Sequence, residues 1–406
     1  MLIDFNCTNF KSFKDASSFT MTSSPDTSYE DELISFDDKK YVKQAVVLGP
    51  NGSGKSNFIN AIFAMKNIVL YNYMYYEKKV FPFAPFIDQI DEPTELSIQF
   101  EKKGVRYYYG FTYNQTKIIS EFLYIYPNGR ETKIFKKEKM EFSCNQKYES
   151  LFKHVRFWCN DNMLILSSAN NICDIDYILE TYKFFEEDLI SYHFDGFRNI
   201  KDSNLMRLKD ESTKKRLLSF LKTIDAGIVD YQLPDMTFKY LENYDFMNVN
   251  DIAKMDISRE KNLIKLRKCL ILDYGNKKIP FSLASSGVHK IIDFFCYAVD
   301  AIDNGRVIIA DEFESHIHPL VARQILVLFN NNSTNEKAQM IFTSNETMLL
   351  NLKYLRRDQV WFAEIIKETR ATNLYSLSQV KNVRKVENIQ KNYVTGKYGA
   401  IPCIDD

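Results

Sequence analysis

The chain has 406 residues, which is enough for two to three domains that each bury a core. Lys plus Arg and Asp plus Glu number 53 each, so the formal net charge is zero and bulk attraction to nucleic acid is excluded. The seven cysteines have no paired spacing, and no apolar run is long enough to span a membrane. We therefore expect a reduced, cytoplasmic protein with neither a disulfide framework nor a membrane partner.

The first elements in the chain are predicted to be strand, strand, turn and helix. Residues 2–10 alternate as a strand that breaks at Asn9, and residues 44–48 form a short apolar strand that is buried on both faces. The cluster that follows, residues 49–52, contains glycine, proline and asparagine and predicts a turn. After Lys55 the apolar residues follow a helical period, with Phe58, Ile62, Met65 and Val69 on one face.

The middle of the chain changes from β-rich to helical patterns. Residues 96–135 contain the runs LSIQF, VRYYYGFTY and IISEFLYIY, which are separated by turn residues and predict an antiparallel meander. Residues 151–265 contain long stretches with a helical pattern, such as 175–192 and 211–224. The α/β pattern returns from Phe281, with a helix over 287–303, a strand over 307–310, a helix after Pro319 and a strand over 340–343.

This order predicts an α/β fold with one core built from both ends of the chain. Residues 1–150 would supply the N-terminal half of the core and an antiparallel β-lobe, residues 151–265 a mainly helical insertion or lid, and residues 266–406 the C-terminal half. Two independent domains are the alternative. The split core is favoured because complementary motifs near residues 50 and 311 would serve one site.

The strongest motif follows the predicted strand over residues 44–48. It matches G-x-x-x-x-G-K-[ST] and lies between a strand and a helix, as phosphate-binding loops do. Its glycines let successive backbone N–H groups point at phosphates beside a helix N-terminus. Lys55 would reach the β- and γ-phosphates, and the Ser56 hydroxyl would bind Mg²⁺. The predicted nucleotide-binding residues are Gly49, Pro50, Asn51, Gly52, Ser53, Gly54, Lys55, Ser56 and Asn57.

A second motif ends the predicted strand over residues 307–310 with two carboxylates. Asp311 is predicted to hold Mg²⁺, and Glu312 is predicted to orient and deprotonate the attacking water, with Lys55 as the third charged group of the site. A solvated strand end would explain such acids equally well on their own. The phosphate-binding loop favours the catalytic interpretation.

Further motifs carry a resemblance to a known family. Residues 283–287, LASSG, are similar to the signature of ABC-type ATPases, although a helix cap would be the simplest explanation of the serine. The whole set resembles an ABC-type ATPase head of the RecF/SMC/OLD-like group, and especially the bacterial anti-phage ATPases of the RloA, AriA and AbiL kind. The similarity includes NFKSF at residues 9–13, DEFESHIHP at 311–319, LRRDQV at 355–360 and NYVTGKYGAIP at 392–402.

The resemblance implies a function and a set of ligands. It implies an ABC ATPase head that binds ATP and Mg²⁺ between two subunits, with Ser285 and Gly287 of one subunit facing the γ-phosphate held by the other. A homodimer or a higher oligomer would close on ATP. The chain would then be the sensor or regulatory subunit of an anti-phage defence system. Its effector would be a separate nuclease or toxin, because the sequence contains no nuclease motif.

The sequence also departs from the family pattern. Asn345 stands where the family usually places a histidine, and asparagine can hydrogen-bond to a γ-phosphate or a water but cannot shuttle a proton. It is nevertheless the third predicted catalytic residue, with slow hydrolysis as the expectation. The signature lacks an acid and a hydroxyl, since Ser286 and Val288 flank Gly287. Gln89 and Gln99 both remain candidates for the family's conserved glutamine.

Two other functions are left open by the sequence. One is a RecF/SMC-like repair ATPase that binds DNA, for which the basic stretches at residues 136–139, 214–216 and 259–268 would be candidate contacts. The zero net charge weighs against it. The other is a scaffold that binds nucleotide without hydrolysing it, which Asn345 would favour.

Overall fold

The computed structural model describes residues 1–78, 80–139, 141–158, 162–194, 202–233, 237–239, 266–268, 270–384 and 387–402. It contains two compact units. The first unit comprises Met1–His193, Asp300–Ser315 and Ile325–Asp406, and the second comprises Phe194–Val299 and His316–Gln324. The second unit thus begins later than the predicted insertion, and residues 240–265 of that insertion, with most of its basic stretch, lie outside the described residues.

The first unit contains a seven-stranded sheet in the order β10-β9-β8-β7-β6-β1-β2, in which every neighbouring pair is antiparallel. The central strands pair along nearly their whole length, and the hairpins fall at the predicted turns, so the predicted meander is confirmed. The strands are β1 (Leu2–Thr8), β2 (Ser17–Thr20), β6 (Thr94–Lys102), β7 (Val105–Tyr113), β8 (Ile118–Tyr126), β9 (Thr132–Glu138) and β10 (Glu141–Cys144).

The second sheet of this unit is built from both ends of the chain. Its order is β11-β17-β18-β5-β19-β20, and all pairs are parallel except β19 with β20. Strands β5, β17 and β18 are buried at every position, which explains their unbroken apolar runs. The strands are β5 (Gln44–Leu48), β11 (Leu189–Tyr192), β17 (Val307–Ala310), β18 (Gln339–Thr343), β19 (Val360–Ile365) and β20 (Thr372–Ser376).

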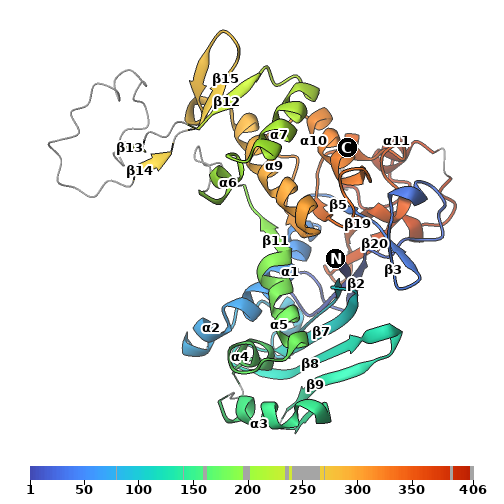
Figure 1. The fold of residues 1–406 in the computed structure, drawn as a ribbon. Coiled ribbons are helices and arrows are strands. Elements are labelled where there is room, and N and C mark those ends of the chain that lie inside the picture. Colours follow the sequence, from blue (N-terminus) through green and yellow to red (C-terminus); the bar gives the residue numbers. More distant parts are fainter. Residues whose placement is uncertain are drawn as a thin grey trace. The chain divides into compact units, whose positions relative to one another are not determined.

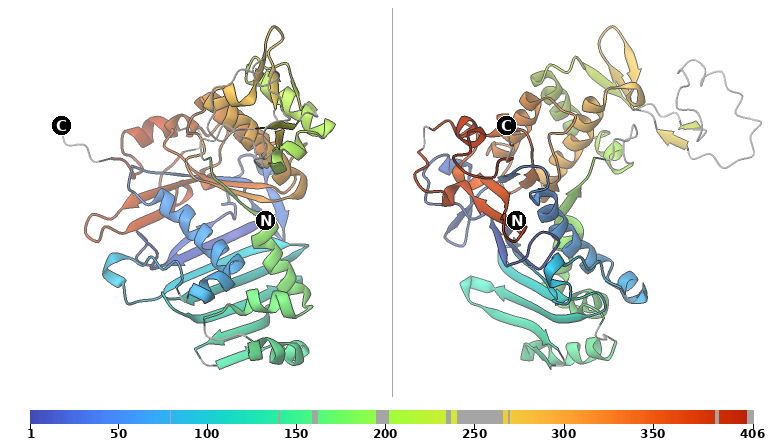
Figure 2. Two further views of the ribbon diagram at one scale, coloured as in Figure 1. Left: turned by 90° about the vertical axis from the view of Figure 1, so that its left-hand side faces the viewer. Right: turned by 180° about the vertical axis from the view of Figure 1, so that it is seen from behind.

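Helix α1 (Lys55–Leu70) runs across one face of the antiparallel sheet (Figures 1 and 2). Its predicted apolar face is confirmed, because Phe58, Ile62, Met65 and Val69 all belong to the buried core that α1 shares with both sheets. The Phe58 ring lies 5.0 Å from the ring of Phe19. Helices α2 (Asn72–Lys78), α3 (Glu149–Trp158), α4 (Ile165–Ile172) and α5 (Asp176–Lys183) follow in the same unit.

Helix α4 is attached to the antiparallel sheet by a buried carboxylate. Glu121 of β8 accepts hydrogen bonds from the backbone N–H groups of Ile165 and Leu166, at 2.5 and 2.9 Å, and from the Tyr109 hydroxyl at 3.0 Å. The carboxylate therefore caps the helix N-terminus from a neighbouring strand. Burial raises the pKa of Glu121 to about 7, although these hydrogen bonds act in the opposite direction.

One predicted helix is partly wrong. Only Asp176–Lys183 of the stretch 175–192 is α-helical; a π-helical turn (Phe184–Asp188) follows, and Leu189–Tyr192 is strand β11. A four-residue apolar segment cannot be assigned by periodicity, because a helix and a buried strand look alike over that length. The parallel pairing with β17 decides the outcome, and it makes β11 the outermost strand of its sheet.

The second unit contains mainly helices and short strands. Its long helix is α9 (Ser286–Asn304), which confirms the helix predicted over 287–303 and whose last residues belong to the first unit. No helix among the described residues is long and apolar enough to cross a membrane. The other elements named here are α6 (Asp202–Arg207), α7 (Glu211–Thr223), β12 (Asp230–Gln232), β15 (Ile271–Asp273), β16 (Lys278–Pro280) and α10 (Pro319–Asn330), which spans both units.

Candidate nucleotide-binding site

Three parallel strands bring the two main motifs together. Strand β18 lies between β5, which precedes the phosphate-binding loop, and β17, which precedes Asp311. The carboxyl ends of parallel strands meet at one edge of a sheet, and ligands bind outside that edge. The Ser56 hydroxyl accordingly lies 3.2 Å from Asp311 Oδ1, although the two residues are 255 positions apart. The Thr343 hydroxyl, at the end of β18, donates to the same carboxylate oxygen at 2.5 Å.

Lys55 is folded back into the phosphate-binding loop. Its Nζ donates to the carbonyl oxygens of Gly49 and Pro50, at 2.7 and 3.0 Å, and the residue is only 6% exposed. Burial lowers the pKa of Lys55, whereas the nearby carboxylates of Glu312 and Asp311 raise it. The loop therefore holds a cation beside its own backbone, where triphosphate oxygens would be better partners than two neutral carbonyls.

The backbone of the loop leaves no room for side chains at two of its glycines. A Cβ at Gly49 would overlap the Ala363 carbonyl oxygen, and a Cβ at Gly54 would overlap the Thr372 hydroxyl. Gly54 also has a φ of 101°, which side chains rarely tolerate. Beside them, the buried Ser53 hydroxyl has no hydrogen-bond partner among the described residues. This orphaned hydroxyl in a glycine cradle fits a phosphate ligand.

A cluster of hydroxyl groups hydrogen-bonds to the backbone of the phosphate-binding loop. The Thr372 hydroxyl donates to the Ser53 carbonyl oxygen at 2.8 Å and accepts from the Ser12 hydroxyl, 2.7 Å away. Asn57 Nδ2 donates to the same Ser12 hydroxyl at 2.8 Å, and Thr372 N–H donates to the Ser12 carbonyl at 2.7 Å. Asn57 therefore contacts the support of the loop, so its predicted place beside the nucleotide stays a prediction.

The two carboxylates after Asp311 define the outer side of the site. Glu312 is exposed and has a φ of 45°, an uncommon conformation for a residue other than glycine that clusters at functional sites. Its backbone N–H donates to the Thr343 hydroxyl at 2.8 Å. Asn345 Nδ2 lies 3.5 Å from Glu312 Oε1, and the Asn345 N–H donates to Glu314 Oε1 at 2.7 Å. Glu312 and Asn345 are thus adjacent, as a shared catalytic role would need.

The signature residues belong to the second unit. Ser285 precedes α9 and is exposed, and its hydroxyl accepts a hydrogen bond from the Val288 N–H at 3.3 Å, so it also serves as a helix cap. A Cβ at Gly287 would come within 2.9 Å of the His316 carbonyl oxygen, so the glycine permits close packing inside this unit. Both residues therefore have structural roles beside the predicted one.

The structure brings together most predicted residues and adds some that the sequence reasoning missed. The predicted residues in contact at the first unit's sheet edge are Gly49, Pro50, Lys55, Ser56 and Asp311, with Glu312 and Asn345 beside them. Asn51 and Gly52 are exposed at the loop tip. Of the two glutamines, Gln99 lies in the middle of β6 and Gln89 in the short turn Ile87–Gln89. The missed residues are Ser12, Glu314, Thr343 and Thr372.

A signal for Thr343 was present in the sequence. It ends an apolar strand that follows the strand of Asp311, and a strand placed between the two motif strands must end at the site. Ser12 lies in the NFKSF motif, but nothing local to Ser12 or Thr372 predicts their contact with the loop, because they reach it only through tertiary pairing.

A family model and several solved structures are similar to the chain. A family model described as "AAA domain, putative AbiEii toxin, Type IV TA system" matches residues 45–150 and 179–350. No curated protein shows significant similarity to the chain. Among solved structures, an SMC head bound to the C-winged helix domain of ScpA covers 94% of this chain and 98% of its own, with 14% identity and a TM-score of 0.48.

Two further solved structures are similar to a comparable degree. The SMC head domain from Thermotoga maritima has 12% identity, a TM-score of 0.41 and coverage of 92% of this chain and 98% of that chain. An Smc head domain with an extended coiled coil, bound to the C-terminal domain of ScpA from Pyrococcus furiosus, has 11% identity, a TM-score of 0.44 and coverage of 93% and 97%.

The family match covers well over half of the chain and includes both motifs that meet at the sheet edge. The chain therefore belongs to the AAA-domain family that is described with the putative AbiEii toxin of type IV toxin–antitoxin systems, and it is a P-loop ATPase.

Proposed function

We propose that the chain hydrolyses ATP at the edge of the parallel sheet and that it does so as the regulatory subunit of an anti-phage defence system. The observation that carries the catalytic part is the 3.2 Å contact between Ser56 Oγ and Asp311 Oδ1. It joins the loop that would hold the triphosphate to the carboxylate that would hold its counter-ion, and no local sequence constraint forces these two residues together.

The donor set at this contact fits Mg²⁺. The cation prefers hydroxyl and carboxylate oxygens, and Ser56 Oγ and Asp311 Oδ1 supply one of each. The Thr343 hydroxyl would fix the orientation of the Asp311 carboxylate by its hydrogen bond. When bound, Mg²⁺ would offset the negative charge that develops on the phosphates.

The remaining steps belong to residues of this chain. Lys55 would exchange the Gly49 and Pro50 carbonyls for phosphate oxygens, which are stronger acceptors. The exposed Glu312 carboxylate would accept a proton from the attacking water. Asn345, whose amide lies 3.5 Å from Glu312, would hold that water or a γ-phosphate oxygen by hydrogen bonds. Since an amide carries no charge, we expect slow turnover.

The same proposal includes a second subunit and an effector. Ser285 is exposed at the beginning of α9, a position from which its hydroxyl could reach a nucleotide held by another copy of the chain. The family description names a toxin and a toxin–antitoxin system, which supports a defence role with a separate nuclease or toxin as effector. ATP would close the dimer because its γ-phosphate is contacted from both sides only in the closed state.

Mixing two inactive variants tests the shared site. Lys55→Met removes the phosphate-binding cation, and Ser285→Arg blocks the signature. In a mixed dimer, the intact loop of one chain faces the intact signature of the other, so one site of two is complete. We expect each variant alone to be inactive and the equimolar mixture to regain about a quarter of the wild-type ATPase rate, since about half of the dimers are mixed.

Matched measurements decide between outcomes. As a control, Lys55→Met is mixed with Lys55→Glu. Both variants keep the wild-type signature, but neither has an intact phosphate-binding loop, so this mixture should stay inactive. Activity of Ser285→Arg alone would contradict a site completed by a second subunit. A mixture of the two variants that stays inactive despite subunit exchange, measured by light scattering, would contradict it as well.

A further inference from the structure

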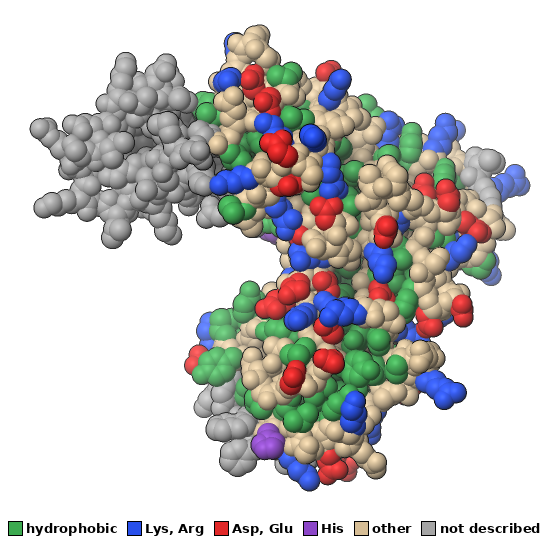
Figure 3. Space-filling view, viewed as in Figure 1, with side chains coloured by type: hydrophobic (Ala, Val, Ile, Leu, Met, Phe, Trp, Pro, Cys, Tyr) green, Lys and Arg blue, Asp and Glu red, His purple; other side chains and the backbone are tan. Residues whose placement is uncertain are grey.

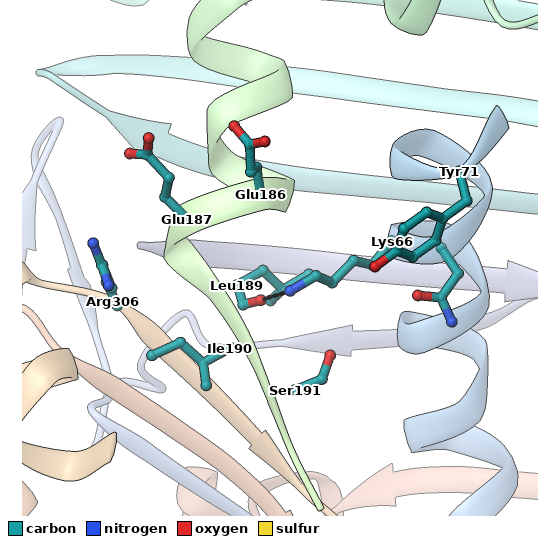
Figure 4. Close-up of a pocket in the computed structure, with 9 residues that line it drawn as sticks. Lys66, Tyr71, Glu186, Glu187, Leu189, Ile190, Ser191 and Arg306 are labelled. Carbon is teal, nitrogen blue, oxygen red and sulfur yellow. Dashed lines mark hydrogen bonds between the residues drawn. The ribbon is translucent and has the colours of Figure 1, made fainter. Parts of the chain in front are cut away.

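A pocket of about 430 Å³ lies in the first unit, away from the phosphate-binding loop. It is formed where the last turns of α1, the π-helical turn after α5 and strand β11 meet, and Figure 4 shows the residues that line it. The volume is within the range of ligand-binding clefts. The residues that matter for its chemistry are Lys66, Glu186, Glu187, Ser191 and Arg306.

The inner wall of the pocket offers two cations with unused hydrogen-bonding capacity. Lys66 extends from α1 toward β11, and its Nζ donates to the Leu189 carbonyl oxygen at 2.5 Å (Figure 4). Burial lowers the pKa of Lys66 to about 8, which a bound anion would reverse. Arg306 pairs with Asp300 at 2.6 Å, but its buried Nε has no hydrogen-bond partner among the described residues. Both groups are hydrogen-bond donors, so each suits an anionic acceptor.

The edge of the sheet is part of the same pocket. β11 is the outermost strand, and the N–H and C=O of Leu189 bond to Phe184 and Lys66 and not to another strand. Backbone groups of alternate residues point to the same side of a strand, so those of Ser191 also point away from β17. Ser191 is exposed and lines the pocket. The strand edge at Ser191, beside this cavity, is where an extended peptide can add.

The rim of the pocket carries the opposite charge. Glu186 and Glu187 are exposed, and Glu187 lies with Arg306 on the side of β11 opposite α1 (Figure 4). Acidic and basic side chains stand next to one another over the junction of α5 and β11 (Figure 3). Two carboxylates at the rim disfavour a polyphosphate but suit a ligand that carries both signs, such as a peptide with an acid and, two residues on, a base.

We propose that this pocket binds an extended peptide segment of a partner protein, which adds to the β11 edge at Ser191 and places a carboxylate side chain against Lys66. A basic side chain two residues further would lie on the same face of the extended peptide, about 7 Å away, and would meet Glu186 or Glu187. The site is separate from the nucleotide, so the proposal does not depend on ATP hydrolysis.

The test uses the full chain without nucleotide and two fluorescein-labelled peptides. The Asp peptide is Thr-Val-Asp-Val-Lys-Val, and the Asn peptide has Asn in place of its Asp. We expect the Asp peptide to bind and the Asn peptide to bind about tenfold more weakly, as the loss of a charge-assisted hydrogen bond predicts. Lys66→Met should lower the affinity for the Asp peptide by about tenfold, whereas Lys66→Arg should retain most of that affinity. Ser191→Pro removes one outward N–H at an edge position that tolerates proline, and it should also weaken binding.

Controls make each outcome decisive. Lys78→Met removes an exposed lysine at the end of α2 and should leave the affinity unchanged. Thermal unfolding followed by circular dichroism establishes that each variant is folded. The proposal is overturned if the wild-type chain does not bind the Asp peptide at about 1 mM, if both peptides bind equally, or if folded Lys66→Met and Ser191→Pro bind as tightly as the wild type.

Discussion

Glu312→Gln is expected to lower ATP turnover by about 10²- to 10⁴-fold while ATP binding is retained. The substitution keeps the shape of the side chain but removes its ability to accept a proton from water. Because the γ-phosphate is then not released, ATP should also hold the dimer closed. The release of phosphate measures the loss of turnover. The retention of labelled ATP on a dimer during gel filtration measures whether ATP holds the dimer closed.

Glu314→Gln is the matched control for this experiment. Glu314 is, after Glu312 and Asp311, the third carboxylate close enough to raise the pKa of Lys55, and it accepts the Asn345 N–H at 2.7 Å. If the loss of a negative charge near Lys55 were the cause, both variants would lose turnover alike. We expect a loss of only a few-fold for Glu314→Gln, on the scale of one positioning hydrogen bond. A Glu312→Gln variant that turns over at the wild-type rate, or a wild-type chain without any turnover, would contradict the assignment.

Arg356→Met is expected to lower the free energy of unfolding by about 3–5 kcal/mol, the usual cost of breaking a buried ion pair. Arg356 and Asp358 are almost fully buried and are joined by three hydrogen bonds, including one of 2.7 Å. The Asp358 carboxylate also accepts the N–H and hydroxyl of Ser24, and Arg356 donates to the Ser28 carbonyl. Without Arg356, the Asp358 charge would stay buried and unpaired.

The double variant Arg356→Met with Asp358→Leu separates this cause from lost packing. Since both charges are removed, a large part of the lost stability should return. Arg357→Gln serves as a second comparison, because Arg357 pairs with Asp26 at 2.8 Å but its side chain is 25% exposed, so we expect a smaller loss. Urea unfolding measures the free energy of unfolding of Arg356→Met, of the double variant and of Arg357→Gln. A single Arg356→Met variant within about 1 kcal/mol of the wild type would contradict this account.

The sequence predicted those elements whose signal is local. Strands β5 and β17 lie at their predicted residues because an unbroken apolar run that ends in turn residues or acids has few other solutions. The loop from Gly49 to Ser56 could be predicted because its chemistry requires glycines at fixed spacing. Even the contact between Ser56 and Asp311 was predictable in kind, since both motifs serve one ligand.

The elements that could not be predicted depend on tertiary pairing. The segment Leu189–Tyr192 follows a helix and has only four residues, so its strand character comes from pairing with β17. Ser12 and Thr372 support the phosphate-binding loop from segments 360 residues apart, and although Ser12 lies in the NFKSF motif, neither residue has a local signal for this contact. Lys66 had the pattern of an ordinary helix residue, and only the fold places it beside the edge of a sheet.

The most direct test of the central claim measures whether Ser56 and Asp311 act on one ion. Binding of a nonhydrolysable ATP analogue is measured by calorimetry with and without Mg²⁺ for the wild type, Ser56→Ala, Asp311→Asn and the double variant. We predict that Mg²⁺ tightens binding in the wild type, that each single variant loses about tenfold or more of this gain, and that the double variant loses no more than the worse single one. Full retention of the Mg²⁺ effect in Asp311→Asn, or strictly additive losses, would contradict the account.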